Sequence, residues 1–182
     1  MSPYDPSPQR LTPARFATLF RESSRVLWCV AVGVVGDRAH GEDIVQEAAL
    51  VALGKLETFQ PGTSFAAWMG QTVRYLALNH RRKVHRRRVA LDAEGSQLAP
   101  AGLPATDAQT MFDRSVSNAL AELSEPQRTC LLLKTVVELE YAEIAELLEM
   151  PAGTAMSHVS RARAKMRTLL EPEPAPSKEA MP

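Results

Sequence analysis

Apolar residues recur at helical spacing along most of the chain, and no segment alternates with period two long enough to predict a strand. The first predicted helix starts at Thr12, whose hydroxyl can cap it and is followed by a proline, and ends at Gly36. A second helix is predicted over about residues 41–57, where "FQPGTS" breaks the pattern. A third is predicted to begin near Ser64 and to continue through residues 74–88. The periodicity therefore predicts an all-α fold.

The helical pattern falls into two blocks. Residues 91–110 are rich in Ala, Gly, Pro and small polar side chains, which predicts a flexible linker. Helical periodicity resumes near residue 111 and continues to residue 170. The ends of the chain, residues 1–11 and 171–182, are polar and rich in proline, and we expect them to be disordered. The pattern predicts two small helical domains, residues 12–90 and 111–170, joined by that flexible linker.

The second block has the pattern of a helix-turn-helix. Ser124 is predicted to cap a helix that runs to about Val136, and a short helix follows over "YAEIAELL". A tight break is predicted at residues 149–153, after which Thr154 is predicted to cap a longer helix. A short helix, a brief turn and a second helix with a basic outer face are typical of a motif whose second helix enters the DNA major groove.

The final helix of this motif carries basic residues and no acidic ones. From Pro151 to Leu170 the chain has four Lys or Arg and no Asp or Glu. The predicted inward stripe is Ala155, Val159, Ala162, Met166 and Leu169. The predicted outer face carries Ser157, His158, Arg161 and Lys165, with Arg163 and Arg167 beside it. The alternative is a plain helical hairpin with a solvated face, but solvated helices ordinarily mix both signs of charge.

Positive charge is also concentrated in residues 74–88, although the whole chain has 21 basic and 21 acidic residues. This block contains seven Lys or Arg and two His in fifteen positions, and Phe65, Trp68 and Tyr75 accompany it. Bases stack on aromatic rings while basic side chains follow phosphates, so the combination suits single-stranded or melting DNA. The alternatives are that Phe65 and Trp68 belong to the core, and that the basic run binds RNA or acidic lipid.

Composition excludes several other classes of function. Cys29 and Cys130 lack metal-ligand spacing and are interpreted as buried thiols in a reducing cytoplasm. The amino terminus does not have the pattern of a signal peptide, and the longest apolar run is too short to span a bilayer. His80 and His85 suggest a metal-dependent nuclease only weakly, because no nearby Asp, Glu or Cys completes a ligand set. We therefore expect a cytoplasmic protein with no membrane segment, no metal and no cofactor.

The stretch "GEDIVQEAALVALGKLETFQPGTSFAAWMGQTVRYLALNHRRK" resembles the second conserved region of extracytoplasmic-function (ECF) sigma factors, the small bacterial initiation factors of the sigma-70 family. The segments "LSEPQR", "YAEIAELL" and "PAGTAMSHVSRARAKMR" resemble their fourth region. The resemblance covers residues 12–170. It implies a non-enzymatic subunit that directs RNA polymerase to promoters. It also implies three partners: promoter DNA, the polymerase core through its beta-prime clamp and beta flap, and an anti-sigma factor. A free-standing helix-turn-helix regulator is the alternative.

The resemblance also implies three sets of contact residues, with region 2 at residues 12–90 and region 4 at residues 111–170. The polymerase clamp would be bound by Asp43, Gln46 and Glu47. The minus-ten element would be bound by Thr63, Ser64, Phe65, Trp68, Arg74, Tyr75, Asn79, Arg81, Arg82 and Lys83. Of these, Thr63, Ser64, Phe65 and Tyr75 are the candidates for a pocket that holds a flipped base. The minus-thirty-five element would be bound by Thr154, Met156, Ser157, His158, Arg161, Arg163 and Lys165.

Four positions depart from the family pattern. Tyr75 stands where Asn is usual, Met156 where a basic residue is usual, and His158 where Arg is usual. These three departures predict altered promoter specificity. Glu149 stands in the turn where Gly is common, and a left-handed backbone there costs a non-glycine residue roughly 1 kcal/mol.

Overall fold

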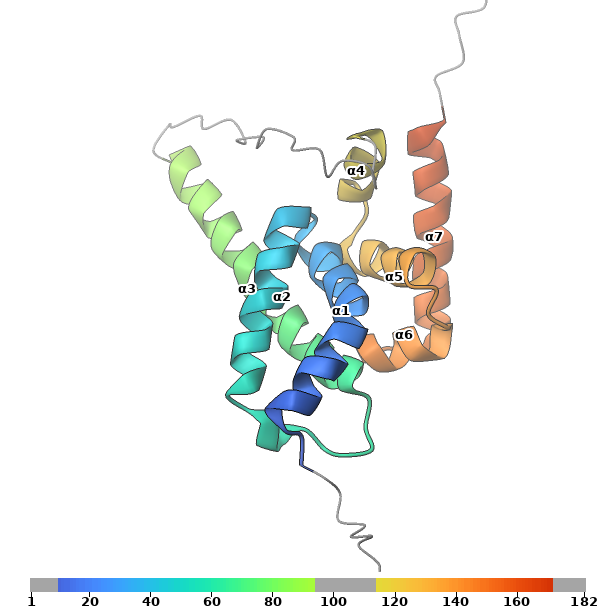
Figure 1. The fold of residues 1–182 in the computed structure, drawn as a ribbon. Coiled ribbons are helices and arrows are strands. Elements are labelled where there is room, and N and C mark those ends of the chain that lie inside the picture. The colour runs from blue at the N-terminus through green and yellow to red at the C-terminus, as the bar shows by residue number, and fades with distance from the viewer. Residues whose placement is uncertain (1–9, 94–113, 172–182) are drawn as a thin grey trace, which may run out of the picture.

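The computed structural model describes residues 10–93 and 114–171, and these residues form α-helices, one 3-10 helix and no strand (Figure 1). This confirms the all-α prediction. The helices are α1 (Pro13–Val35), α2 (Arg38–Leu53), η1 (Leu56–Thr58), α3 (Phe65–Ala93), α4 (Arg114–Ala121), α5 (Glu125–Val136), α6 (Tyr141–Leu148) and α7 (Ala152–Leu170).

Local capping sets the ends of the first two helices. The Thr12 hydroxyl accepts a hydrogen bond from the Arg15 amide at 3.2 Å, and Gly36 ends α1 in the left-handed conformation, with φ of +80°. Both ends were predicted. The predicted second helix was displaced, because the Asp37 carboxylate caps α2 by accepting from the His40 amide at 2.8 Å. The helix therefore starts before residue 41 and ends at Leu53, and the short turn η1 takes up most of the remainder.

The two predicted blocks of helices pack against each other and share one hydrophobic core. Helix α5 lies along α1, and α6 lies against the first part of α3 (Figure 1). Core residues from the first block include Leu27, Val30, Val34, Met69 and Val73, and those from the second include Leu132, Leu133, Ile144, Leu147 and Val159. The sequence pattern predicted two bodies on a tether and did not predict this shared core.

Two glycines allow the blocks to approach closely. A methyl group at Gly33 of α1 would lie 2.7 Å from the Cα atom of Thr129, and one at Gly70 of α3 would lie 2.7 Å from the Leu147 side chain. A glycine in a helix interior costs about 0.5–1 kcal/mol relative to alanine. At these two positions the missing side chain makes room for the backbone of α5 and for a leucine of α6.

Both cysteines are buried, as predicted. Burial raises the pKa of the Cys29 thiol to about 12, and the nearby Arg25 lowers it only in part. Burial likewise raises the pKa of the Cys130 thiol to about 11, against a smaller lowering by a backbone hydrogen bond. Since the thiolate is the nucleophilic form, both thiols are unreactive in this conformation.

Several predicted boundaries need correction. Leu11 was assigned to a disordered end, but its side chain is buried against the core. Residues 91–93 were assigned to the linker, but they continue α3, since nothing in "RVALDA" breaks a helix. The remaining residues of the predicted linker and ends (1–9, 94–110 and 172–182) lie outside the described residues.

The turn before the final helix was predicted only in part. Glu149 does adopt the left-handed conformation, with φ of +53°. Thr154 is not the capping residue: Pro151 holds that position, and its carbonyl accepts hydrogen bonds from the amides of Thr154 and Ala155. Proline has its φ fixed near the helical value, so the helix starts directly after it. Leu169 was predicted to face inward, but 43% of it is exposed.

The left-handed conformation of Glu149 predicts how a substitution there changes the stability of the protein. Glu149→Gly should stabilise the protein by about 1 kcal/mol, because glycine adopts this conformation without the steric cost. For a chain of this size that corresponds to a rise in Tm of about 2–4 °C, measured by thermal unfolding.

The matched control is Glu146→Gly, the same change within α6, where it should destabilise by about 1 kcal/mol. Equal effects of the two substitutions would show that the conformation of Glu149 carries no cost.

Candidate nucleic-acid and protein interfaces

Helix α2 presents a mixed polar and apolar face to solvent. Asp43, Gln46 and Glu47 are all exposed, while Ile44, Ala48 and Ala52 on the other side of the helix are buried. The exposed row continues one turn further with Leu50 and then Leu53, whose side chains are 72% and 42% exposed. Neither leucine was predicted from the sequence to belong to this surface. The available signal was that they fall outside the inward stripe of the helix.

The loop before α3 uses the hydroxyl groups of two candidate residues. The Ser64 hydroxyl accepts a hydrogen bond from the Ala67 amide at 3.2 Å and so caps the helix. The Thr63 hydroxyl donates to the Gln60 carbonyl at 2.7 Å, next to Gly62 with φ of +89°. Both side chains therefore shape the loop in this conformation.

Two of the three candidate aromatic residues of α3 are structural. Phe65 is 6% exposed and packs edge-on against Phe16 and Phe59. Trp68 contacts the rings of Phe59 and Phe65, and its indole N–H donates to the Thr58 hydroxyl at 3.3 Å. Phe65 cannot contact a base in this conformation, because its ring belongs to the core. Tyr75, by contrast, is 65% exposed.

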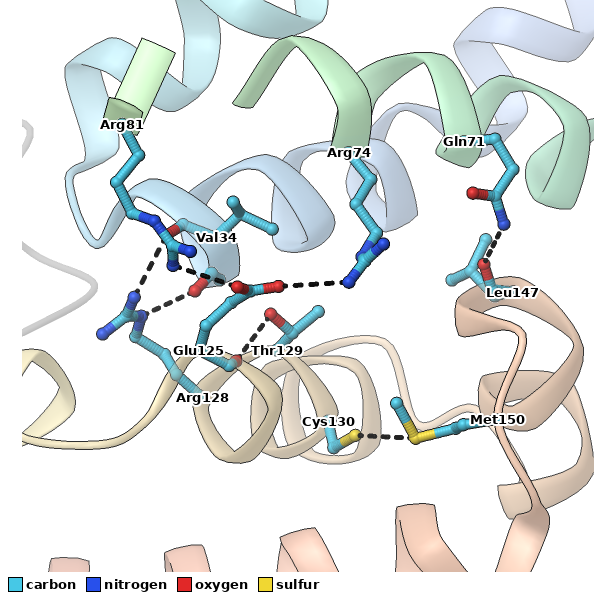
Figure 2. Close-up of polar contacts among 11 residues, drawn as sticks. Val34, Gln71, Arg74, Arg81, Glu125, Arg128, Thr129, Cys130, Leu147 and Met150 are labelled. Carbon is cyan, nitrogen blue, oxygen red and sulfur yellow. Dashed lines mark hydrogen bonds and ion pairs between the residues drawn. The ribbon is translucent and has the colours of Figure 1, made fainter. Parts of the chain in front are cut away.

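The basic residues of α3 divide into two groups. Arg82 and Lys83 are exposed, and Arg82 donates to the Asn79 side-chain carbonyl at 3.4 Å. Arg74 and Arg81 instead face the second block of helices, where both pair with Glu125 of α5 (Figure 2). The nitrogen–oxygen distances are 3.5 Å and 3.0 Å. The sequence analysis missed Glu125 because it lies 44 residues from Arg81 in the chain.

The two histidines of the basic block do not form a metal site with each other. The ring of His80 lies 4.8 Å from the ring of His40, whose Nδ1 atom is 2.7 Å from the Asp37 carboxylate. Across residues 10–93 and 114–171, no group of three or more His, Cys, Asp or Glu is arranged to hold a metal ion.

Helix α7 places its candidate residues on different sides. Met156, Ser157 and Arg161 are exposed, and the Ser157 hydroxyl donates to the Gly153 carbonyl at 2.8 Å. His158 is half-buried and its Nδ1 atom has no hydrogen-bond partner. Thr154 is exposed in the first turn.

The last two candidates of α7, Arg163 and Lys165, are exposed but each also has a neighbour within the protein. Arg163 borders a groove of about 440 Å³ with Leu120 and Leu131. Two residues along a helix correspond to a rotation of about 200°, so Arg163 and Arg161 lie on different faces. The Lys165 ammonium donates to the Glu122 carbonyl. Arg161 is exposed as well, and it lies nearest to the start of the helix among the three basic candidates.

Comparisons with known proteins agree with this arrangement of helices. A model of sigma-70 region 2 matches residues 19–88, and a model of sigma-70 region 4 matches residues 113–166. The chain is 34% identical over 141 residues to the ECF RNA polymerase sigma factor EcfG of Rhodopseudomonas palustris, an alignment that covers 77% of this chain and 76% of the relative. The chain belongs to the ECF sigma factors of the sigma-70 family.

Further proteins are similar to most of the chain in sequence or in structure. The ECF sigma factor SigW of Bacillus subtilis is 28% identical over 148 residues, covering 75% of this sigma factor and 79% of the relative. RpoE of Bartonella quintana, solved in complex with the anti-sigma factor NepR, has a TM-score of 0.64 at 27% identity. The match covers 85% of this chain and 96% of RpoE. CnrH, solved with the cytosolic domain of CnrY, shares the fold with a TM-score of 0.58 at 22% identity and covers 87% of this chain and 89% of CnrH.

As a member of this family the chain directs transcription initiation at promoters. Helix α2 and most of α1 and α3 fall in the region 2 match, and α4, α5, α6 and most of α7 fall in the region 4 match. Within the part of the chain that the structure describes, no helix is long and apolar enough to cross a membrane.

The contrast between the two rings of α3 is testable. Phe65→Ala should lower the free energy of unfolding of the sigma factor by about 3–5 kcal/mol, because it leaves a cavity among packed aromatic side chains. Tyr75→Ala should change it by no more than about 0.5 kcal/mol, since the ring is exposed. Denaturant unfolding of both variants measures the difference. A comparable loss in both would place Tyr75 in the packed structure.

Proposed function

We propose that this sigma factor binds core RNA polymerase in the bacterial cytoplasm through the outer face of α2 and engages promoter DNA through α3 and α7. The observation that carries the proposal is the exposed row on α2, where Leu50 and Leu53 extend the polar side chains of Asp43, Gln46 and Glu47. Exposed apolar side chains rimmed by polar ones are typical of protein-binding surfaces. We assign this row to the beta-prime clamp.

The minus-ten element is assigned to the exposed side of α3. Tyr75 supplies a ring for base stacking, and Asn79, Arg82 and Lys83 supply polar and basic contacts for the backbone. Thr63 and Ser64 lie at the amino end of the same helix and hold the loop in shape. Phe65 and Trp68 support that loop from the core side.

The minus-thirty-five element is assigned to the first turns of α7, because a recognition helix contacts base edges with its amino-terminal residues. Met156, Ser157 and Arg161 are exposed there. Arg161 is best suited to read a guanine, since its guanidinium can donate two hydrogen bonds to one base edge. Arg163 and Lys165 are exposed but lie further along the helix, so we assign them to the DNA backbone.

We also propose an anti-sigma partner. RpoE of Bartonella quintana, a relative at 27% identity, was solved with such a partner. This sigma factor has a groove between α1 and α2, bordered by Trp28, Val45 and Gln46 and completed by Val136 of α5. A helix bound there would contact both blocks of helices and cover part of the α2 surface assigned to polymerase.

Polymerase binding is tested on the α2 row. Asp43→Lys with Glu47→Lys should abolish binding to core polymerase, and Leu50→Asp alone should weaken it at least tenfold, with helical content unchanged. The measurement is copurification with core polymerase followed by titration of the purified components.

The matched control is Glu146→Lys, a charge reversal at an exposed position of α6. Wild-type affinity of the double variant would remove the α2 assignment. A free-standing DNA-binding regulator, the alternative function, would not copurify with polymerase at all.

Base reading is tested on α7. Arg161→Ala should cost about 1–3 kcal/mol at one promoter position and relax the base preference there. Lys165→Ala should weaken binding to all promoters alike. Transcription by each holoenzyme from a library of minus-thirty-five sequences measures both effects. If Arg161→Ala lowers every promoter equally, Arg161 contacts only phosphate.

A further inference from the structure

Met156 is a large apolar side chain in the first turns of α7, the part of the helix assigned to the minus-thirty-five element. It is 52% exposed and stands where the family usually has a basic residue. A single exposed apolar residue is ordinary on a protein surface. Met156 differs from such residues in its position, because its neighbours on α7 are the side chains assigned to promoter DNA.

The centre of the outward face of α7 carries only small side chains. Successive residues of an α-helix are rotated by about 100°, which places Gly153, Ser157 and Ala164 in one row. This row is exposed and lies opposite the buried Ala155 and Ala162. A Cβ atom added at Gly153 would meet nothing within 4 Å. The Ser157 hydroxyl donates to the Gly153 carbonyl at 2.8 Å, so it lies against the helix. The low row therefore allows the backbone of α7 to come close to a base edge.

Longer side chains flank this row on both sides. By the same rotation, Met156 lies on one side of the row and Arg161 on the other, about 140° apart. Arg163 follows on the side of Met156, and Lys165 follows on the side of Arg161. Five residues of helix rise about 7.5 Å, which corresponds to roughly two base-pair steps. A helix that approaches DNA with its low row would therefore present Met156 and Arg161 to different base pairs.

The chemistry of methionine limits what Met156 can recognise. Its thioether has no hydrogen-bond donor and is only a weak acceptor. Against a guanine edge it would leave the O6 and N7 acceptors without a partner, which is unfavourable once water is excluded. The apolar group that DNA presents in the major groove is the 5-methyl group of thymine. Methionine is unbranched and polarisable, so it adapts its shape to such a group.

We propose that Met156 is a specificity-determining residue, which recognises a thymine of the minus-thirty-five element by contact with its 5-methyl group. The inference rests on the proposed assignment of α7 to that element and deepens it, since it names the base and the group that are contacted. Arg161 recognises a different base pair through hydrogen bonds. A basic residue at position 156 would bind phosphate or guanine instead, so methionine there changes which promoters are preferred.

The first test removes the methyl group from the DNA. Transcription by holoenzyme from a library of minus-thirty-five sequences identifies the thymines that the wild-type protein prefers. Each of these is then replaced by uracil, which forms the same base pair but lacks the methyl group. At the thymine contacted by Met156, the replacement should weaken binding of holoenzyme to a labelled promoter duplex roughly fourfold, the effect of burying one methyl group.

The second test removes the side chain. Met156→Ala should bind the thymine and uracil duplexes equally, because the group that contacts the methyl is missing. Met156→Leu keeps an apolar side chain of similar size and should keep the preference for thymine. Thermal unfolding of both variants should match that of the wild-type protein, since the side chain is exposed.

The matched control is Leu169→Ala, which removes an exposed apolar side chain from the last turn of the same helix. It should keep the wild-type ratio of thymine to uracil affinity at every position. An undiminished ratio in Met156→Ala, whatever its overall affinity, would overturn the inference. A wild-type library without a thymine preference at any position would overturn it as well.

Arg161→Ala separates this inference from the function on which it rests. Suppose that Arg161→Ala relaxes a base preference while Met156→Ala leaves every ratio of thymine to uracil affinity unchanged. The methyl contact is then wrong, and the assignment of α7 to the minus-thirty-five element stands. If neither variant changes any base preference in that element, the assignment of α7 is wrong, and the inference with it.

Discussion

The near contact between Gly33 and Thr129 governs the arrangement of the whole molecule. It lets α5 lie directly on α1, and Arg128 then reaches the free carbonyl groups at the end of α1. With α5 in that position, Glu125 meets α3, and α6 comes to rest where Gly70 leaves room for Leu147. Helix-end hydrogen bonding, charge pairing and core packing are therefore satisfied together between the two blocks.

The candidate surfaces differ in how far this arrangement leaves them exposed. The outer face of α2 and the first turns of α7 are exposed, whereas two arginines of α3 are paired. The surface proposed for polymerase is thus accessible in this packing, whereas part of the surface proposed for the minus-ten element is paired with Glu125. Tyr75, which is assigned to base stacking, is exposed on the same helix, so only the basic part of the α3 surface faces the junction.

Local sequence signals predicted the helices well and the junction not at all. Thr12, Gly36 and Ser124 act on neighbouring amides and carbonyls, so short windows of sequence reveal them. Thr154 was wrongly predicted to cap α7, because the capping position is held by Pro151, three residues earlier. Phe65 was offered as a base contact, although the pattern alone also allowed the core position that it occupies. The roles of Glu125 and Arg128 depend on partners about 44 to 95 residues away, which periodicity cannot locate.

The hydrogen bonds of Arg128 also determine how the junction can separate. Its four acceptors are backbone carbonyls, including those at the ends of α1 and α4, and solvent can serve them once the helices part. Because water replaces the protein partners of Arg128, each such hydrogen bond adds only a small net free energy to the stability of the junction. The free energy that keeps the junction closed then comes mainly from apolar contact, which weakens on cooling. The strength of the junction is accordingly set by the hydration of hydrocarbon surface and decreases in the cold.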